Sequence, residues 1–255
     1  MLPELIDTHC HLDVAAFDPD RGEVVARARE AGVRHIIVPA IARAGWEKLE
    51  SICRDDDGLH AAYGLHPVFL DDHVDSDIDA LEQCLALGGA IAVGECGLDH
   101  FIPTLDRGHQ RRLFEAQLAL ARQFDLPVIV HARRAVEAVI ASIRRVGNVR
   151  GVVHSYGGSV EQARELHRLD FMIGIGGPYT WERAKRLHKV AREVPIEQLL
   201  LETDAPDQSD EGWREKRNEP ERLRKIAESV AETRDSDLQS LAKACFENAK
   251  RMFTV

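Results

Sequence analysis

The stretch Pro127-Val128-Ile129-Val130-His131 indicates most directly how this chain folds. Its apolar side chains occupy successive positions, so both faces of an extended segment would be buried, as in a parallel sheet covered by helices. Ile36-Ile37-Val38 and Leu199-Leu200-Leu201 repeat the pattern. We therefore expect a parallel sheet with a histidine at the end of at least one strand.

Eight such runs alternate with amphipathic stretches along the 255 residues. The expected strands cover residues 4–9, 35–39, 61–65, 90–93, 127–130, 151–153, 171–175 and 198–201. The expected helices cover residues 23–31, 46–54, 77–87, 107–124, 134–145, 159–169, 181–192, 220–233 and 237–253. Strand starts recur every 20 to 37 residues, which is typical of repeated βα units. The sequence predicts a single α/β domain over residues 1–255, a TIM (β/α)8 barrel with extra C-terminal helices.

A doubly wound open sheet is the alternative architecture. Such a sheet usually carries a glycine-rich phosphate loop after its first strand. Here the first strand runs into Asp7-Thr8-His9-Cys10-His11, and the glycine cluster Gly174-Ile175-Gly176-Gly177 lacks the dinucleotide-binding spacing. We therefore favour the closed barrel and interpret the glycine cluster as a tight turn.

The composition, 44% hydrophobic and 30% charged, is that of an ordinary globular protein. No apolar run approaches ~20 residues and the N-terminus lacks a secretion signal, so a cytoplasmic protein without a membrane partner is expected. The five cysteines lack C-x-x-C spacing and are expected to be reduced thiols. The net charge is −10 without a basic stripe, so any anionic substrate must be attracted locally.

Residues that bind metals stand at the ends of the strand runs. They are His9 and His11 after the first, Glu95 after the fourth, His131 after the fifth, His154 after the sixth and Asp204 after the eighth. Because active sites of α/β barrels are built at the C-terminal ends of the strands, these side chains are expected to converge.

The pair His9-Cys10-His11 suits a divalent cation, because residues i and i+2 of an extended chain face the same side. Glu95 stands between glycines after an apolar strand, where a buried carboxylate is costly unless a cation compensates it. Its two oxygens could bridge two ions. The alternatives are a pair of core histidines and a loop glutamate in solvent. The prediction of a metal site therefore rests on all six residues together.

Asp204 could bind a metal through one oxygen and accept a proton from water through the other. Four neutral imidazoles and two carboxylates carry a charge of −2, and two divalent ions with a bridging hydroxide would leave the cluster near +1. That centre would attract a phosphate or carbonyl oxygen. The donor set leaves open whether the metal is Zn, Mn, Mg, Co or Ni.

Several segments together resemble the signature of the TatD family of metal-dependent hydrolases, most of all its YjjV-like branch. The match spans essentially the whole chain. The segments are Ile6-Asp7-Thr8-His9-Cys10-His11-Leu12-Asp13, Gly64-Leu65-His66-Pro67, Gly94-Glu95-Cys96-Gly97-Leu98-Asp99, Pro127-Val128-Ile129-Val130-His131-Ala132-Arg133, Val153-His154-Ser155, Leu201-Glu202-Thr203-Asp204-Ala205-Pro206 and Asn248-Ala249-Lys250-Arg251-Met252-Phe253.

The resemblance implies a TIM barrel of the metal-dependent hydrolase superfamily with two divalent metal ions. One ion would be held by His9, His11, Glu95 and Asp204, and the other by Glu95, His131 and His154. It also implies phosphodiester hydrolysis, as a deoxyribonuclease acting 3′ to 5′ on single strands through an activated hydroxide. The expected partners are DNA ends or a small phosphodiester.

Three further residues are candidates for substrate contacts. His66 matches a family histidine close to the site, where the alternative is a helix cap, and Arg133 would hold the scissile phosphate with it. Arg217 lies in a segment that the resemblance places near the site, while its neighbour Asn218 is expected to cap the helix beginning near Pro220. Residues Ala132, Cys96 and Tyr156 depart from the commoner family pattern, which bears on substrate preference.

Two rival functions remain. An amidohydrolase or lactonase could use the same metals on a carbonyl, although the strand ends offer no lysine for a bridging carbamate. A non-catalytic metal or nucleic-acid binding module is the other, and the complete ligand set without a basic patch disfavours it. No motif indicates an obligatory protein partner, and the oligomeric state stays open.

Overall fold

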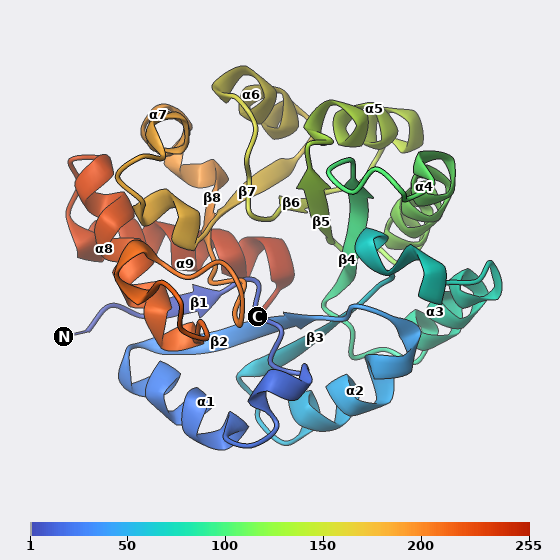
Figure 1. Ribbon diagram of the computed structural model, residues 1–255, viewed down its shortest axis with the longest axis horizontal. Helices are drawn as coiled ribbons and strands as arrows, with labels where there is room; N and C mark the ends of the chain where they lie inside the picture. The colour runs from blue at the N-terminus through green and yellow to red at the C-terminus, as the bar shows by residue number, and fades with distance from the viewer. Residues whose placement is uncertain (1) are drawn as a thin grey trace.

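The computed structural model describes residues 2–255 and shows eight parallel strands in chain order around a barrel (Figure 1). The strands are β1 (Leu5–Asp7), β2 (Val33–Pro39), β3 (Leu59–Tyr63), β4 (Ala92–Asp99), β5 (Val128–Arg133), β6 (Gly151–Val153), β7 (Phe171–Ile175) and β8 (Leu199–Leu201). Seven ladders join neighbouring strands from β1 to β8. The predicted TIM barrel is confirmed.

The last gap of the barrel, between β8 and β1, is bridged just beyond the two strand ends. Thr8 N donates to Leu201 O at 3.1 Å, and Asp204 N donates to His9 O at 2.8 Å. A parallel bridge joins Cys10 to Ala205. The first and last metal-type segments of the sequence are thereby held side by side, although almost 200 residues separate them.

Helices cover the outside of the strands (Figure 1). The α-helices are α1 (Arg21–Glu30), α2 (Trp46–Arg54), α3 (Ser76–Ala86), α4 (Arg107–Gln123), α5 (Val136–Val146), α6 (Val160–Arg168), α7 (Lys185–Glu193), α8 (Leu223–Thr233) and α9 (Leu238–Phe253). Each predicted helix is found, and the largest shift is in α7, which starts four residues later than its predicted range. Over residues 2–255 no helix is long and apolar enough to cross a membrane.

The inside of the barrel is a packed core closed at its N-terminal end by α9. One apolar residue from each strand points inward: Ile6, Ile37, Ala62, Ala92, Ile129, Val152, Met172 and Leu200. Ala249, Met252 and Phe253 of α9 pack against this layer. Only the C-terminal ends of the strands therefore remain available for a site, as barrel architecture requires.

Strand β4 runs further than its apolar segment suggests. The predicted strand ends at residue 93, whereas β4 continues through Glu95 to Asp99 and pairs with β5 as far as Arg133. The extension contains Gly97, where a Cβ atom would come within 2.1 Å of His131 O. Glycine thus allows the two strands to approach closely. Because glycine adds no apolar side chain, the hydrophobicity pattern does not predict this part of β4.

Candidate metal centre

The two histidines after β1 direct their Nε2 atoms toward each other. These atoms lie 3.2 Å apart, and the ring planes are nearly perpendicular. His11 Nδ1 lies 3.1 Å from Pro39 O, which fixes the His11 ring through the end of β2. Cys10 between them is buried in the outer core. Both histidines therefore present Nε2 to a common point.

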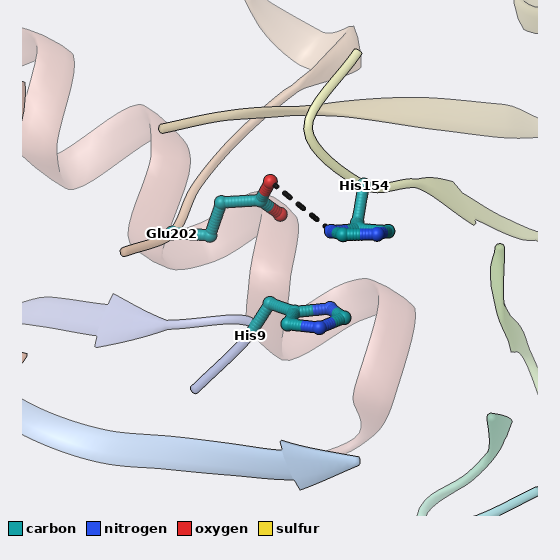
Figure 2. A group of neighbouring side chains, drawn as sticks. All are labelled: His9, His154 and Glu202. Atoms are coloured by element: carbon teal, nitrogen blue, oxygen red, sulfur yellow. Dashed lines mark ion pairs between the residues drawn. The ribbon is translucent and has the colours of Figure 1, made fainter. Parts of the chain in front are cut away.

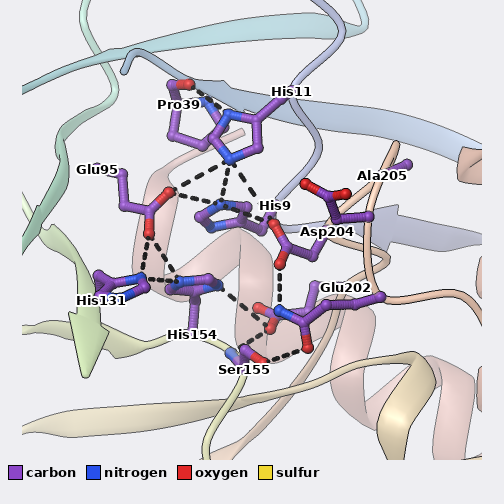
Figure 3. Close-up of polar contacts among 12 residues, drawn as sticks. His9, His11, Pro39, Glu95, His131, His154, Ser155, Glu202, Asp204 and Ala205 are labelled. Carbon is purple, nitrogen blue, oxygen red and sulfur yellow. Dashed lines mark hydrogen bonds and ion pairs between the residues drawn. The ribbon is translucent and has the colours of Figure 1, made fainter. Parts of the chain in front are cut away.

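Glu95 lies at the centre of the cluster and divides it into two halves (Figure 3). Its Oε2 atom is 3.0 Å from His9 Nε2 and 3.3 Å from His11 Nε2. The other oxygen, Oε1, is 3.0 Å from His131 Nδ1 and 2.8 Å from His154 Nε2. One buried carboxylate thus faces two pairs of imidazoles through its two oxygens.

His66 joins the second half of the cluster from the start of a 3₁₀ segment. Its Nε2 atom lies 3.0 Å from Glu95 Oε1, and its Nδ1 atom accepts a hydrogen bond from Val68 N at 3.1 Å. Both alternatives for His66 are therefore observed. Its Nδ1 atom caps the 3₁₀ segment, and its Nε2 atom lies in the cluster.

Asp204 completes the first half. Its Oδ1 atom is 3.5 Å from His9 Nε2 and 3.7 Å from His11 Nε2. Gln208 Nε2 donates to Oδ2, and Gln208 Oε1 accepts from Ser155 Oγ at 2.6 Å. The Asp204 backbone is left-handed, with φ of 56°, a conformation that aspartate tolerates better than most residues and that is common at functional sites.

Asp99 holds His131 from behind. Its Oδ2 atom is 3.0 Å from His131 Nε2, while Oδ1 accepts from the N–H groups of Phe101 and Ile102. Burial opposes ionisation, but the hydrogen bonds from His131 and from these N–H groups outweigh burial and lower the pKa of Asp99 to about 2. Such a carboxylate fixes the orientation of a metal-binding imidazole.

Sequence reasoning missed this role of Asp99. In a strand, residues i and i+4 share a face, so Asp99 follows Glu95 onto the inner face of β4. The sequence predicts this role for Asp99 only if β4 is taken to continue past Gly94 and Gly97.

Glu202 lies beside His9 and His154, whose rings stack with centroids 3.9 Å apart (Figure 2). The distance from His154 Nδ1 to Glu202 Oε1 is 3.8 Å, and Ser155 N donates to the same oxygen. Its other oxygen, Oε2, approaches Gly174 so closely that a Cβ atom there would lie 2.1 Å away. Glu202 therefore contacts the histidine cluster directly. Gly174 belongs to β7, so the interpretation of the glycine cluster as a tight turn is wrong at this residue.

Electrostatics show how strongly the centre attracts positive charge. Burial would raise the pKa of Glu95, but the imidazoles of His154, His66 and His9 outweigh it and hold the pKa well below its usual range. Burial would lower the pKa of His154, but Glu95 and other carboxylates raise it to about 10. In the chain alone, protons on imidazoles provide the charge that Glu95 needs.

These residues fit divalent cations. Glu95 Oε2 is buried and has no hydrogen-bond partner, although two Nε2 atoms lie within 3.3 Å of it. His9, His11 and Glu95 form one group of donor atoms within 4.8 Å of one another, and His66, Glu95 and His131 form a second. Imidazole and carboxylate donors are those preferred by first-row divalent metals. A cation would supply the charge with the imidazoles neutral.

A cavity of about 1240 Å³ opens over the cluster. Glu95, His131, His154 and Asp204 of the cluster line it, as do His66 and Arg133. The predicted metal residues and the predicted contacts His66 and Arg133 are thus brought together. The space is large enough for a substrate well beyond a single phosphate.

Arg217 is not brought to this cavity. Its guanidinium forms ion pairs with Asp20 at 2.6 Å and Glu219 at 2.8 Å. Asn218 is buried and donates to Thr203 O and Asp207 O, while its Oδ1 accepts from Glu219 N. The prediction that Asn218 caps the helix beginning near Pro220 is wrong, because the N-cap is Glu219. The Asn218 amide instead stabilises the loop after β8 through its hydrogen bonds to Thr203 O and Asp207 O.

The two aspartates that flank the histidine pair do not contact the rings. Asp7 accepts hydrogen bonds from Thr203 N, Thr203 Oγ1 and His9 N, so it joins the ends of β1 and β8. Asp13 is buried beside them, and its Oδ1 has no hydrogen-bond partner among the described residues. The rings of His11 and His131 are instead oriented by Pro39 O and Asp99.

Comparison with known proteins agrees with this geometry. The family model described as TatD related DNase matches residues 6–254. The chain is 37% identical to the uncharacterized metal-dependent hydrolase YjjV of Escherichia coli K12, and the match covers 100% of each chain. It is 35% identical to the uncharacterized metal-dependent hydrolase YabD of Bacillus subtilis 168, over 98% of this chain and 99% of YabD. The crystal structure of YjjV, a TatD homolog, superposes with a TM-score of 0.96, covering 100% of each chain at 36% identity. The chain therefore belongs to the TatD family of metal-dependent hydrolases.

Proposed function

We propose that this protein is a phosphodiesterase that shortens single-stranded DNA from its 3′ end with two divalent metal ions. One ion would be held by His9, His11, Glu95 and Asp204, and the other by Glu95, His131 and His154. The observation that carries the proposal is the position of Glu95, whose Oε1 and Oε2 face separate groups of imidazoles. A single-metal site has no need for such a division.

When bound, the two ions would lower the pKa of water and stabilise negative charge on the phosphoryl oxygens. The chain's own residues would position the reacting groups. Asp204, whose Oδ2 accepts a hydrogen bond from Gln208, would accept a proton from the attacking water. His66 and Arg133, which both line the cavity, would bind the scissile phosphate.

A phosphoester is favoured over a carbonyl substrate by the lining of the cavity. Arg133, Arg134 and Arg186 line it, and no lysine does so among the described residues. Arginine matches phosphate geometry through bidentate hydrogen bonds, whereas the carbonyl hydrolase alternative would be favoured by a lysine able to form a bridging carbamate. The family model's description as a DNase points to the same substrate class.

The test is hydrolysis of a short 3′-labelled single-stranded DNA, beside a chromogenic phosphodiester and a panel of lactones. We expect stepwise loss of nucleotides that EDTA and Glu95→Ala both abolish. His60→Ala is the matched control, because it removes a histidine at the opposite end of the barrel. Turnover of lactones with intact DNA would instead identify a carbonyl hydrolase that uses the same centre.

A further inference from the structure

Two phenylalanines on the surface open onto the same cavity. Phe69 is 41% exposed and Phe101 is 42% exposed, and both line the cavity above the metal centre. Single exposed apolar residues are common on protein surfaces. Two large aromatic rings at one polar cavity are a pattern that indicates ligand binding.

The two rings have different neighbours. The guanidinium carbons of Arg133 and Arg134 lie 3.7 Å and 4.7 Å from the centroid of Phe101, so this ring supports two cations. No cation stacks on Phe69 among residues 2–255. The Phe69 ring instead meets His66, with centroids 5.5 Å apart and ring planes at 66°. His66 in turn touches Glu95, so Phe69 stands one side chain away from the reacting centre.

The arginines of this cavity differ from most others in the chain. Arg217 and Arg222 are bound by carboxylates, as are many surface arginines. Within the described part of the chain, Arg133, Arg134 and Arg186 form no ion pair, yet all three line the cavity. In a protein with net charge −10, this is a local concentration of unpaired positive charge.

We propose that Phe69 stacks on the terminal base of a single DNA strand, while Arg134 and Arg186 bind the backbone phosphates that lead away from the scissile phosphate held at Arg133. This inference rests on the proposed function. An aromatic platform beside a row of cations is the usual means of binding single-stranded nucleic acid. The cavity volume of about 1240 Å³ exceeds the ~300–1,000 Å³ typical of a site for one small ligand, which suits more than one nucleotide.

The test measures equilibrium binding by the metal-free protein in EDTA, so that no cleavage interferes. The probes are 5′-fluorescein-labelled (dT)6 and the same strand with an abasic 3′-terminal residue, followed by fluorescence anisotropy. We expect the wild type to prefer the base-bearing end by about tenfold. Phe69→Leu should reduce this preference to near one, and Phe69→Trp should retain it. Leu87→Ala, an exposed apolar residue outside the cavity, is the matched control.

The inference is overturned if Phe69→Leu keeps the preference of the wild type, or if Phe69→Trp loses it as fully as leucine does. Cleavage by the metal-loaded wild type separates this failure from failure of the proposed function. A wild type that shortens DNA while Phe69→Leu keeps its preference refutes only the role of Phe69. A wild type that neither binds nor shortens DNA refutes both proposals.

Discussion

The barrel carries histidine clusters at both of its ends, and only one has the form of a metal centre. At the C-terminal end, five imidazoles surround the carboxylate of Glu95: His9, His11, His66, His131 and His154. At the N-terminal end, His35 of β2 and His60 of β3 face each other, with Nδ1 of the first 3.0 Å from Nε2 of the second. The His35 ring lies 6.4 Å from that of Phe246 on α9.

The difference lies in the carboxylates. His35 and His60 form no ion pair in the described part of the chain, and burial lowers the pKa of both, for His60 to about 4. Beside Glu95, carboxylates raise the pKa of His11, His131 and His154. Burial still lowers the pKa of His9 and His66, although Glu95 opposes it. Neighbouring histidines alone therefore do not specify a metal centre in this fold. The candidate metal centre differs in having a buried carboxylate between its histidines, and such a carboxylate requires a compensating positive charge.

The largest expected effect comes from Glu95. Glu95→Gln keeps the volume of the side chain but removes the charge that both halves of the centre share. We expect hydrolysis to fall by about a thousandfold or more, with loss of at least one bound ion. Metal analysis of the purified variant and its rate on labelled DNA test this together. A variant with full metal content and wild-type rate would refute the shared role.

Metal addition should stabilise the protein through one cluster and not through the other. A ligand present at 100 times its dissociation constant stabilises by about 2.7 kcal/mol, which is roughly 5–10 °C for a domain of this size. We expect this shift of Tm in the wild type and in His60→Ala, and a much smaller shift in His154→Ala. An equal loss of the shift in both variants would contradict the comparison between the two ends.

A smaller effect is expected from Asp99, which holds His131 without facing Glu95. Asp99→Asn should weaken metal binding by about 10- to 100-fold, because the His131 imidazole loses its charged partner. Competition with a fluorescent chelator measures the affinity directly. Asp207→Asn, which alters another carboxylate at the cavity, is the matched control. An unchanged affinity in Asp99→Asn would show that the His131 ring is oriented by other contacts.

The smallest effect concerns His60 and acid stability. Because the pKa of His60 is lowered in the folded state, the unfolded chain takes up this proton first as the pH falls. The stability contributed by the neutral ring is therefore present above pH ~6.5 and is lost between pH ~6.5 and ~4. The full shift corresponds to about 3 kcal/mol, and we expect about half because the ring is partly exposed. Urea unfolding in EDTA should show less acid destabilisation in His60→Asn than in the wild type.

Strand and helix periodicity predicts most of the fold, because parallel strands buried on both faces leave a plain apolar pattern. The ranges 151–153 and 171–175 coincide with β6 and β7, and α2 coincides with its predicted range. The pattern fails at β4, where glycines and carboxylates take the place of apolar residues. Gly94, Glu95 and Gly97 interrupt the hydrophobic run, although the backbone stays extended through Asp99.

The convergence of the candidate metal residues is predictable for the same reason: they follow apolar strands whose C-terminal ends must converge. Their supporting contacts are not. Asp99, Gln208 and Pro39 O contact His131, Asp204 and His11. These contacts join residues far apart in the sequence or depend on local geometry, so the sequence pattern does not reveal them. Arg217 shows the opposite failure, since its segment resembles the family pattern while its guanidinium is bound by Asp20 and Glu219.

The most direct test of the account is anomalous diffraction from crystals grown with Mn²⁺ or Zn²⁺. We predict two peaks per chain, one on the Oε2 side of Glu95 beside His9 and His11, the other on the Oε1 side beside His131 and His154. A single peak, or metal bound between His35 and His60, would contradict the claim that Glu95 joins two cation sites in one centre.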